Sequence, residues 1–158
     1  MTQSANQPTQ LKTFLWYGAG QLDAALDFYG SIFGAEMRVL TRNQMGPGGP
    51  LFTAEFDIYG HQFVGMAVEG GPSFTDAISL SLSVDGQDEV DRLWDSLTAN
   101  GGEPGRCGWL KDQFGISWQV VPFQMFQYLG NPDSAVREYA QQAMMRMNKI
   151  VIKDFARP

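Results

Sequence analysis

Side chains that could do acid–base or nucleophilic chemistry are few in this sequence, and they do not cluster along it. The single histidine, His61, could act as a general base near neutral pH. It lies in the turn Tyr59-Gly60-His61, where a solvent-facing hairpin residue is the simpler interpretation. The single cysteine, Cys107, could be a nucleophile, but a lone cysteine at the start of a strand is more often a small buried apolar residue.

A second pair of candidates lies at the turn Asp112-Gln113-Phe114-Gly115. Asp112 could be a catalytic carboxylate, or its side chain could accept hydrogen bonds within the turn. Lys111 could bind an anion or remain solvated. No Ser-His-Asp order and no paired-carboxylate spacing accompanies these residues, so the sequence alone defines no catalytic set.

Composition and charge limit the classes of function. A chain of 158 residues with 44% hydrophobic and 13% aromatic content can form one compact domain with a real core. The 17 acidic side chains outnumber the 11 basic ones, so no basic face can form, and neither nucleic acid nor an anionic membrane is an expected partner.

Targeting and cross-linking signals are also absent from the sequence. No apolar run approaches the roughly 20 residues of a membrane span. The first ten residues, MTQSANQPTQ, lack a charged region followed by an apolar one, so we expect no signal peptide and predict a cytoplasmic protein. One cysteine allows neither an internal disulfide nor a cysteine-rich zinc site.

The elements that must position these residues form two similar series. The first series predicts a strand at 11–17, a helix at 23–33, a strand at 36–42 and a hairpin of strands 51–58 and 62–68. The helix carries an apolar stripe of Leu22, Leu26, Tyr29 and Phe33.

The second series begins with the clearest strand signal in the chain. Residues 78–84 read ISLSLSV, an alternation that places Ser79, Ser81 and Ser83 on one face. A helix at 88–99 follows, then a short extended piece near 103 and strands at 107–111 and 117–121. After these we expect a short helix or turn at 122–130, a helix beginning at Asn131-Pro132, and a last strand or irregular tail at 149–155.

Repetition decides the expected fold class. Asp57-Ile58-Tyr59-Gly60 and Asp112-Gln113-Phe114-Gly115 are similar turns, and each half reads strand, helix, three strands. We therefore predict an α+β fold of two βαβββ units, about 11–70 and 77–122, whose curved mixed sheets form a shared cavity with helices outside. A single domain would span 11–153, with a C-terminal helical extension at 123–153 and a flexible tail at 1–10.

Several stretches resemble one known family. The strings FLWY, AALDFYGSIFGAE and CGWLKDQFGISWQVVP are similar to those of PhnB-like proteins, often named 3-demethylubiquinone-9 3-methyltransferase, within the glyoxalase, bleomycin resistance and dioxygenase (vicinal oxygen chelate) superfamily. The resemblance covers about residues 11–153. It implies the vicinal oxygen chelate fold and a homodimer, because this fold commonly pairs.

The methyltransferase name can be tested against the sequence. A Rossmann-type site for S-adenosylmethionine needs a glycine-rich turn between strand and helix within an alternating βα chain. The one candidate, Gly18-Ala19-Gly20, is followed by Asp23 where a third glycine is expected, and no βαβαβ run surrounds it. The sequence does not support the methyltransferase name.

The resemblance also implies where a metal would bind. Metal-dependent members of the superfamily take His, Gln or Glu ligands from the first and last strand of each unit. Those positions fall here on Phe14, Val64, Ser79 and Gln119. Phe and Val cannot coordinate a metal and Ser is a poor ligand, so we expect neither a metal nor any other cofactor.

The same face of the predicted sheets suits an organic ligand better. Aromatic and apolar walls with a few neutral hydrogen-bonding groups are typical of small-molecule sites. The predicted ligand-binding residues are Phe14, Trp16, Val64, Met66, Ser79, Ser81, Trp109, Ser117 and Gln119. Alternatively, these side chains could simply fill the interior of the sheets.

Three functions remain open at this point. The leading hypothesis is metal-independent binding of a small apolar or aromatic molecule. Its rival is a metal-dependent lyase, isomerase or dioxygenase with displaced ligands. The third is a structural or interaction role, favoured if Phe14, Trp16 and Met66 fill the cavity themselves.

Overall fold

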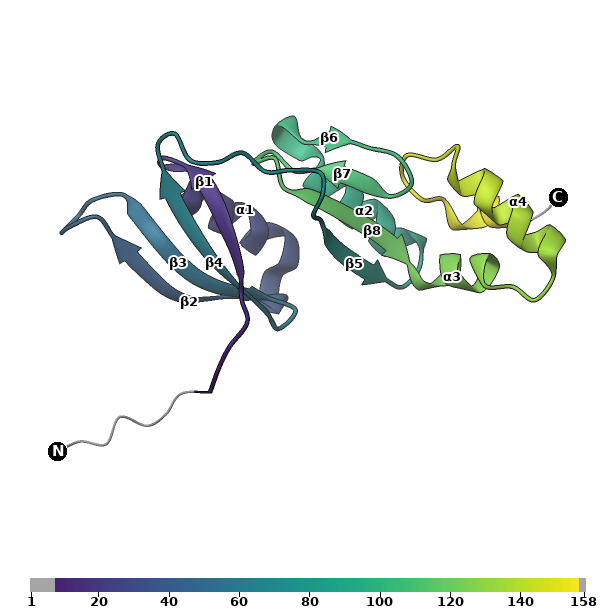
Figure 1. Ribbon diagram of the computed structural model, residues 1–158, viewed down its shortest axis with the longest axis horizontal. Helices are drawn as coiled ribbons and strands as arrows, with labels where there is room; N and C mark the ends of the chain where they lie inside the picture. Colours follow the sequence, from purple (N-terminus) through teal and green to yellow (C-terminus); the bar gives the residue numbers. More distant parts are fainter. Residues whose placement is uncertain (1–7, 157–158) are drawn as a thin grey trace. The chain divides into compact units, whose positions relative to one another are not determined.

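The computed structural model describes residues 8–156, and the chain divides into two compact units, Met1–Pro72 and Ser73–Pro158 (Figure 1). Most of the predicted flexible tail, residues 1–7, lies outside the described residues, and residues 8–10 form neither helix nor strand. That residues 11–153 form a single domain stays a prediction.

In its described residues, 8–72, unit 1 contains one α-helix and four strands. In chain order they are β1 (Thr13–Gly18), α1 (Gln21–Phe33), a 3₁₀ turn η1 (Gly34–Glu36), β2 (Met37–Gln44), β3 (Leu51–Ile58) and β4 (His61–Val68). The strand order is β1-β4-β3-β2. β1 and β4 are parallel, whereas the other neighbours are antiparallel. This is the predicted βαβββ series.

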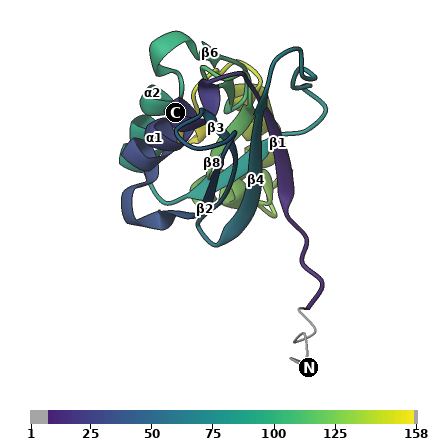
Figure 2. The ribbon, with the colours of Figure 1, turned by 90° about the vertical axis from the view of Figure 1, so that its left-hand side faces the viewer.

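Helix α1 covers one face of this sheet (Figure 2). The predicted stripe of Leu22, Leu26, Tyr29 and Phe33 is buried, as are the sheet residues below it. The helix and sheet approach closely at Gly65, where an added Cβ would lie 2.6 Å from Leu22 Cδ1. The core of unit 1 therefore lies between α1 and this face, and the opposite face of the sheet carries no helix of this unit.

Unit 2 repeats the same topology with shorter outer strands. Its elements are β5 (Leu80–Val84), α2 (Gln87–Leu97), a 3₁₀ turn η2 (Ala99–Gly101), β6 (Glu103–Pro104), β7 (Trp109–Lys111) and β8 (Ser117–Pro122). The strand order β5-β8-β7-β6, with one parallel pair, β5 and β8, matches unit 1 position by position. The predicted α+β fold of two βαβββ units is confirmed.

Helix α2 is amphipathic and packs on the sheet of unit 2 as α1 does on its own. Its buried side chains are those the sequence pattern placed on one face: Val90, Leu93, Trp94 and Leu97. Below them, alternate residues of β8 (Trp118 and Val120) are also buried. The apolar stripe of α2 and these β8 side chains together form the core between the helix and the sheet.

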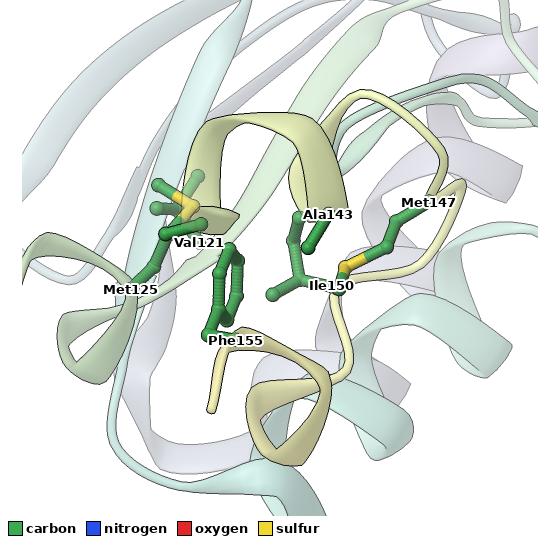
Figure 3. Close-up of a cluster of buried hydrophobic side chains, with 7 residues drawn as sticks. Val121, Met125, Ala143, Met147, Ile150 and Phe155 are labelled. Carbon is green, nitrogen blue, oxygen red and sulfur yellow. The ribbon is translucent and has the colours of Figure 1, made fainter. Parts of the chain in front are cut away.

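The C-terminal extension adds a second core to unit 2. It comprises α3 (Phe123–Leu129), α4 (Ser134–Met144) and a 3₁₀ turn η3 (Ile152–Phe155). Seven side chains form its buried cluster: Val121, Met125, Ala140, Ala143, Met147, Ile150 and Phe155. Figure 3 shows Met125, Ile150 and Phe155 pointing toward one another. The extension thereby covers the end of β8.

Two details of the extension differ from the sequence prediction. The helix α4 begins two residues later than expected, because Asp133 rather than Asn131 is its N-cap and accepts a hydrogen bond from Ala135 N. The Asn131 side chain instead accepts from Asp133 N. The open alternative at 149–155 is decided in favour of a 3₁₀ turn, so no last strand forms there.

Candidate functional site

The open face of the sheet in unit 1 is apolar and aromatic. Phe14 pairs with Val64 and Trp16 with Met66 in the parallel β1–β4 register, so all four predicted residues share this face. The rings of Phe14 and Trp16 are in contact, with centroids 5.6 Å apart, and remain 46% and 36% exposed. These two side chains are therefore available at the surface of unit 1.

A polar border adjoins this aromatic surface. Glu55 is the β3 partner of Val64, and its carboxylate accepts a 2.7 Å hydrogen bond from Lys12 Nζ. Beside it, Thr53 is the β3 partner of Met66, and its hydroxyl accepts from Asn43 Nδ2. The open face thus changes from aromatic at β1 to hydrogen-bonding at β3.

The other predicted residues lie together on the open face of the sheet in unit 2. Gln119 pairs with Ser81 on one side and with Trp109 on the other, which places the three side chains on one face. Gln119 Nε2 donates a 2.8 Å hydrogen bond to Ser79 Oγ. Ser117 lies two residues before Gln119 and joins the same set.

This face borders a cavity of about 380 Å³ within unit 2. The volume is within the range of small-molecule sites, about 300–1,000 Å³. Two predicted residues, Trp109 and Ser117, line it. The others that line it are Asp76, Glu103, Pro104, Gly105, Leu110 and Lys111.

The charged residues of the cavity are linked to one another. Lys111 Nζ lies 2.9 Å from Asp76 Oδ1, and Ser117 Oγ donates to the same oxygen at 3.4 Å. The hydrogen bond and the charge of Lys111 hold the pKa of Asp76 below its ordinary value. In return, Asp76 raises the pKa of Lys111, with a smaller contribution from Glu103. Both groups of the pair are therefore charged at neutral pH.

The sequence did not predict Asp76, Glu103, Pro104, Gly105 or Leu110 as lining residues, and Lys111 was expected either to bind an anion or to remain solvated. Asp76 lies far from Lys111 in the sequence, in a segment without a periodic signal. Glu103 is the cross-strand partner of Lys111, a pairing that depends on the register of two very short strands. Local patterns could not have shown either contact.

The metal-ligand positions implied by the superfamily can now be compared in register. Phe14 faces Val64 in unit 1, and the equivalent pair in unit 2 is Ser81 with Gln119. The position equivalent to Phe14 is therefore Ser81, two residues after the predicted Ser79. The side-chain types at the four positions are unchanged: an aromatic ring, an alkyl group, a hydroxyl and a carboxamide. This set does not fit Zn²⁺, Ni²⁺ or Fe²⁺, which prefer imidazole, carboxylate or thiolate. Within residues 8–156 no group of three or more His, Cys, Asp or Glu could hold a metal ion.

The remaining chemical candidates have structural partners. His61 is exposed, and its Nε2 lies 2.9 Å from Thr13 Oγ1. Cys107 is half-buried, and its thiol donates to Met144 O at 3.4 Å. Asp112 is buried and accepts from Phe114 N, Ile116 N and Trp118 Nε1, as expected of a residue that organises a turn. None of the three lines the cavity.

Comparison with known families agrees with this geometry. The model of the 3-demethylubiquinone-9 3-methyltransferase family matches residues 9–121, which is more than half of the chain. The chain belongs to this family. The match ends inside β8, so α3, α4 and η3 lie beyond the matched range. No match was found among curated proteins.

Solved structures show the same fold. The PhnB protein of Bacillus cereus is 24% identical, with a TM-score of 0.64, and the match covers 72% of this chain and 99% of that one. A protein of Pseudomonas aeruginosa is 19% identical, with a TM-score of 0.56 and coverage of 72% and 98%. A glyoxalase-related enzyme of Fulvimarina pelagi is 23% identical, with a TM-score of 0.52 and coverage of 72% and 88%. The fold is the glyoxalase-like, vicinal oxygen chelate fold.

The family name implies S-adenosylmethionine, but the residues present do not fit a Rossmann-type site for it. Gly18-Ala19-Gly20 does join β1 to α1. The helix then leads to β2, at the far edge of a sheet in which β2, β3 and β4 pair antiparallel. A doubly wound nucleotide site requires a parallel neighbour reached by that helix. The topology at this turn therefore does not provide a Rossmann-type site for S-adenosylmethionine.

Between residues 8 and 156, no helix is both long enough and apolar enough to span a bilayer.

Proposed function

We propose that this chain binds a small, partly aromatic or apolar organic molecule, without a metal, in the cavity of unit 2. The observation that carries the proposal is a ligand-sized cavity lined by Trp109, with the hydroxyl-bearing Ser117 and three charged side chains in the same lining. Trp109 supplies a flat apolar surface, and Ser117 supplies a hydroxyl. Gln119, Ser79 and Ser81 extend the polar part of the same face.

The aromatic surface of unit 1 is the second candidate location. Phe14 and Trp16 are exposed rings in contact, with Val64 and Met66 beside them. Exposed aromatic groups of this kind support stacking of a planar molecule. Binding of such a molecule to unit 1 would depend on Trp16, whereas binding in the cavity of unit 2 would depend on Trp109.

The test is a fragment screen of the full chain by ¹H–¹⁵N NMR, using neutral aromatic probes such as indole and 2-phenylethanol. We expect shifts at Gly105, Trp109 and Ser117. Trp109→Ala should weaken binding at least tenfold, and the matched variant Trp16→Ala should not. The reverse result would overturn the cavity of unit 2 as the site in favour of unit 1, and no binding at either location would overturn the proposal altogether.

Independence from metal has its own measurement. Binding of the best probe should be unchanged by an excess of EDTA over the protein. Elemental analysis after incubation with Zn²⁺, Ni²⁺, Mn²⁺ and Fe²⁺ should find no stoichiometric metal, because the donor set in the register does not suit these ions. Retention of one metal per chain would favour the metal-dependent enzyme instead.

A homodimer and a cytoplasmic location stay predictions. The exposed rings of Phe14 and Trp16 support the homodimer, because apolar groups at a surface are often covered by a partner. Light scattering coupled to size exclusion would test it, with a monomeric mass near 17.5 kDa as the contradicting result.

A further inference from the structure

The charges of the cavity restrict the kind of ligand beyond its size. On the basis of the proposed function, we propose that the cavity of unit 2 selects a small organic cation: an amine, guanidinium or quaternary ammonium group on an aromatic or apolar body. Three charged side chains line the cavity: Asp76, Glu103 and Lys111. Two are anionic and one is cationic, so their sum is one negative charge.

The one cation of the cavity is already engaged. Lys111 Nζ lies 2.9 Å from Asp76 Oδ1, with Ser117 Oγ on the same carboxylate oxygen. Glu103 is the cross-strand partner of Lys111, and its charge also contributes to the raised pKa of Lys111. An anionic ligand would have to displace Asp76 and also approach the Glu103 carboxylate, which like-charge repulsion opposes.

A cation meets favourable groups at the same place. Glu103 is an exposed carboxylate at the cavity wall. Trp109 lies on the same face of β7 as Lys111, two residues earlier, and is also a lining residue of the cavity. Cations are attracted to the face of an indole ring, and a carboxylate beside it adds a Coulombic attraction. The net charge of −6 on the whole chain favours the approach of cations as well.

The experiment compares three probes that share a phenyl ring and differ in charge: 2-phenylethylammonium, 2-phenylethanol and phenylacetate. Each is titrated into the full chain at pH 7.5 and followed at the Trp109 indole N–H by NMR. We expect the cation to bind about tenfold more tightly than the neutral alcohol, and phenylacetate most weakly. The advantage of the cation should shrink as salt is raised.

Three variants sharpen the result. Glu103→Gln should weaken binding of the cation by about fivefold and leave the alcohol unchanged. The matched variant Glu138→Gln, on the exposed surface of α4, should change neither. Lys111→Met should increase the affinity for the cation, because the substitution removes the positive charge of Lys111 from the cavity. Tight binding of phenylacetate that is lost in Lys111→Met would overturn the inference.

The outcomes also separate this inference from the proposed function. If the alcohol and the cation bind with equal affinity at Trp109, the cavity binds small molecules but has no charge preference, and only the inference fails. If none of the three probes perturbs Trp109, Gly105 or Ser117, the proposed function fails as well.

Discussion

The two units have one topology and different open faces. In unit 1 the central pair across the parallel strands is Phe14 with Val64, whereas in unit 2 it is Ser81 with Gln119. The helix-covered faces, by contrast, are apolar in both units. The comparison shows that the buried face sets the topology, because it must bury apolar area, and that the open face is free to differ.

The outer strands differ in length, and this difference accounts for the cavity. β2 and β3 of unit 1 have 8 residues each, whereas β6 and β7 of unit 2 have 2 and 3. Cys107 and Gly108 have positive φ angles of 56° and 84°, which interrupt the extended backbone before β7. Glu103, Pro104 and Gly105 consequently form one wall of the cavity instead of a long strand pair.

The similar turns of the two units also differ once the backbone is known. In unit 1, Asp57 is a strand residue paired with Gln62, and Tyr59-Gly60 form a two-residue turn with both φ angles positive. In unit 2, Gly115 N donates to Asp112 O, and Asp112 N donates to Ile116 O, so the loop is one residue longer. The two turns are therefore similar in sequence but differ in length, because Asp57 stays within the ladder as the predicted strand 51–58 requires.

The C-terminal extension is present only in unit 2, and breaking it should give the largest effect. Phe155 is fully buried and stacks on Tyr128 with ring centroids 5.6 Å apart. We expect Phe155→Ala to lower the free energy of unfolding by about 3–5 kcal/mol. Urea unfolding measures the loss, and hydrogen exchange should accelerate at Val121 and Ala143. Met145→Ala, at an exposed position, is the control and should cost no more than about 0.5 kcal/mol.

The two turn aspartates offer a matched pair of variants. Asp112→Ala would leave three donors without their acceptor, two of them backbone amides and one the buried Trp118 indole. Asp57→Ala would release Arg38, whose side chain is 69% exposed and can be solvated. We expect losses of about 3 kcal/mol for Asp112→Ala and about 1 kcal/mol for Asp57→Ala, measured by urea unfolding. Equal losses would contradict this account of the two turns.

Helix-to-sheet spacing can be tested at Gly65, whose equivalent in β8 is the fully buried Val120. A methyl group at Gly65 would meet Leu22 Cδ1 at 2.6 Å and Tyr17 Cε2 at 3.3 Å. We expect Gly65→Ala to destabilise unit 1 by about 1–3 kcal/mol through overpacking. Gly30→Ala, within α1 and without a neighbour in reach of its Cβ, should instead stabilise by about 0.5–1 kcal/mol. A neutral Gly65→Ala would show that α1 can move away.

The smallest effect should come from the exposed Asp76–Lys111 pair. Lys111 lowers the pKa of Asp76, so this contribution to stability is present above the ordinary carboxyl value of 3.8 and is lost as pH falls through the lowered value. The raised pKa of Lys111 has the opposite sign: its contribution is present below 10.5 and is lost as pH rises through the raised value.

Carbon-detected NMR titration of the Asp76 carboxyl measures this coupling directly. In Lys111→Met the pKa of Asp76 should rise toward its ordinary value, with little change in unfolding midpoint because exposed pairs contribute little. An unchanged titration of Asp76 would contradict the contact and weaken the charge argument for the cavity.

The sequence by itself determined the elements and the faces. Apolar spacing placed the stripes of α1 and α2, and the alternation in ISLSLSV placed Ser79 and Ser81 on the face opposite Leu80 and Leu82. These signals are local, since each depends only on residues a few positions apart, and burial of one face is nearly all that they require.

Only the tertiary structure decided where the candidate site lies. Asp76, Glu103 and Lys111 all line the cavity. The pairing of the short strands β6 and β7 places Glu103 opposite Lys111, and the segment before β5 brings Asp76 to the same lysine. Likewise, the chain after Ile150 is a 3₁₀ turn because Phe155 packs into a cluster with Val121 and Met125, and not because of its own propensity. Contacts between residues far apart in sequence leave no periodic trace, so the cavity and its charge could be found only in the folded chain.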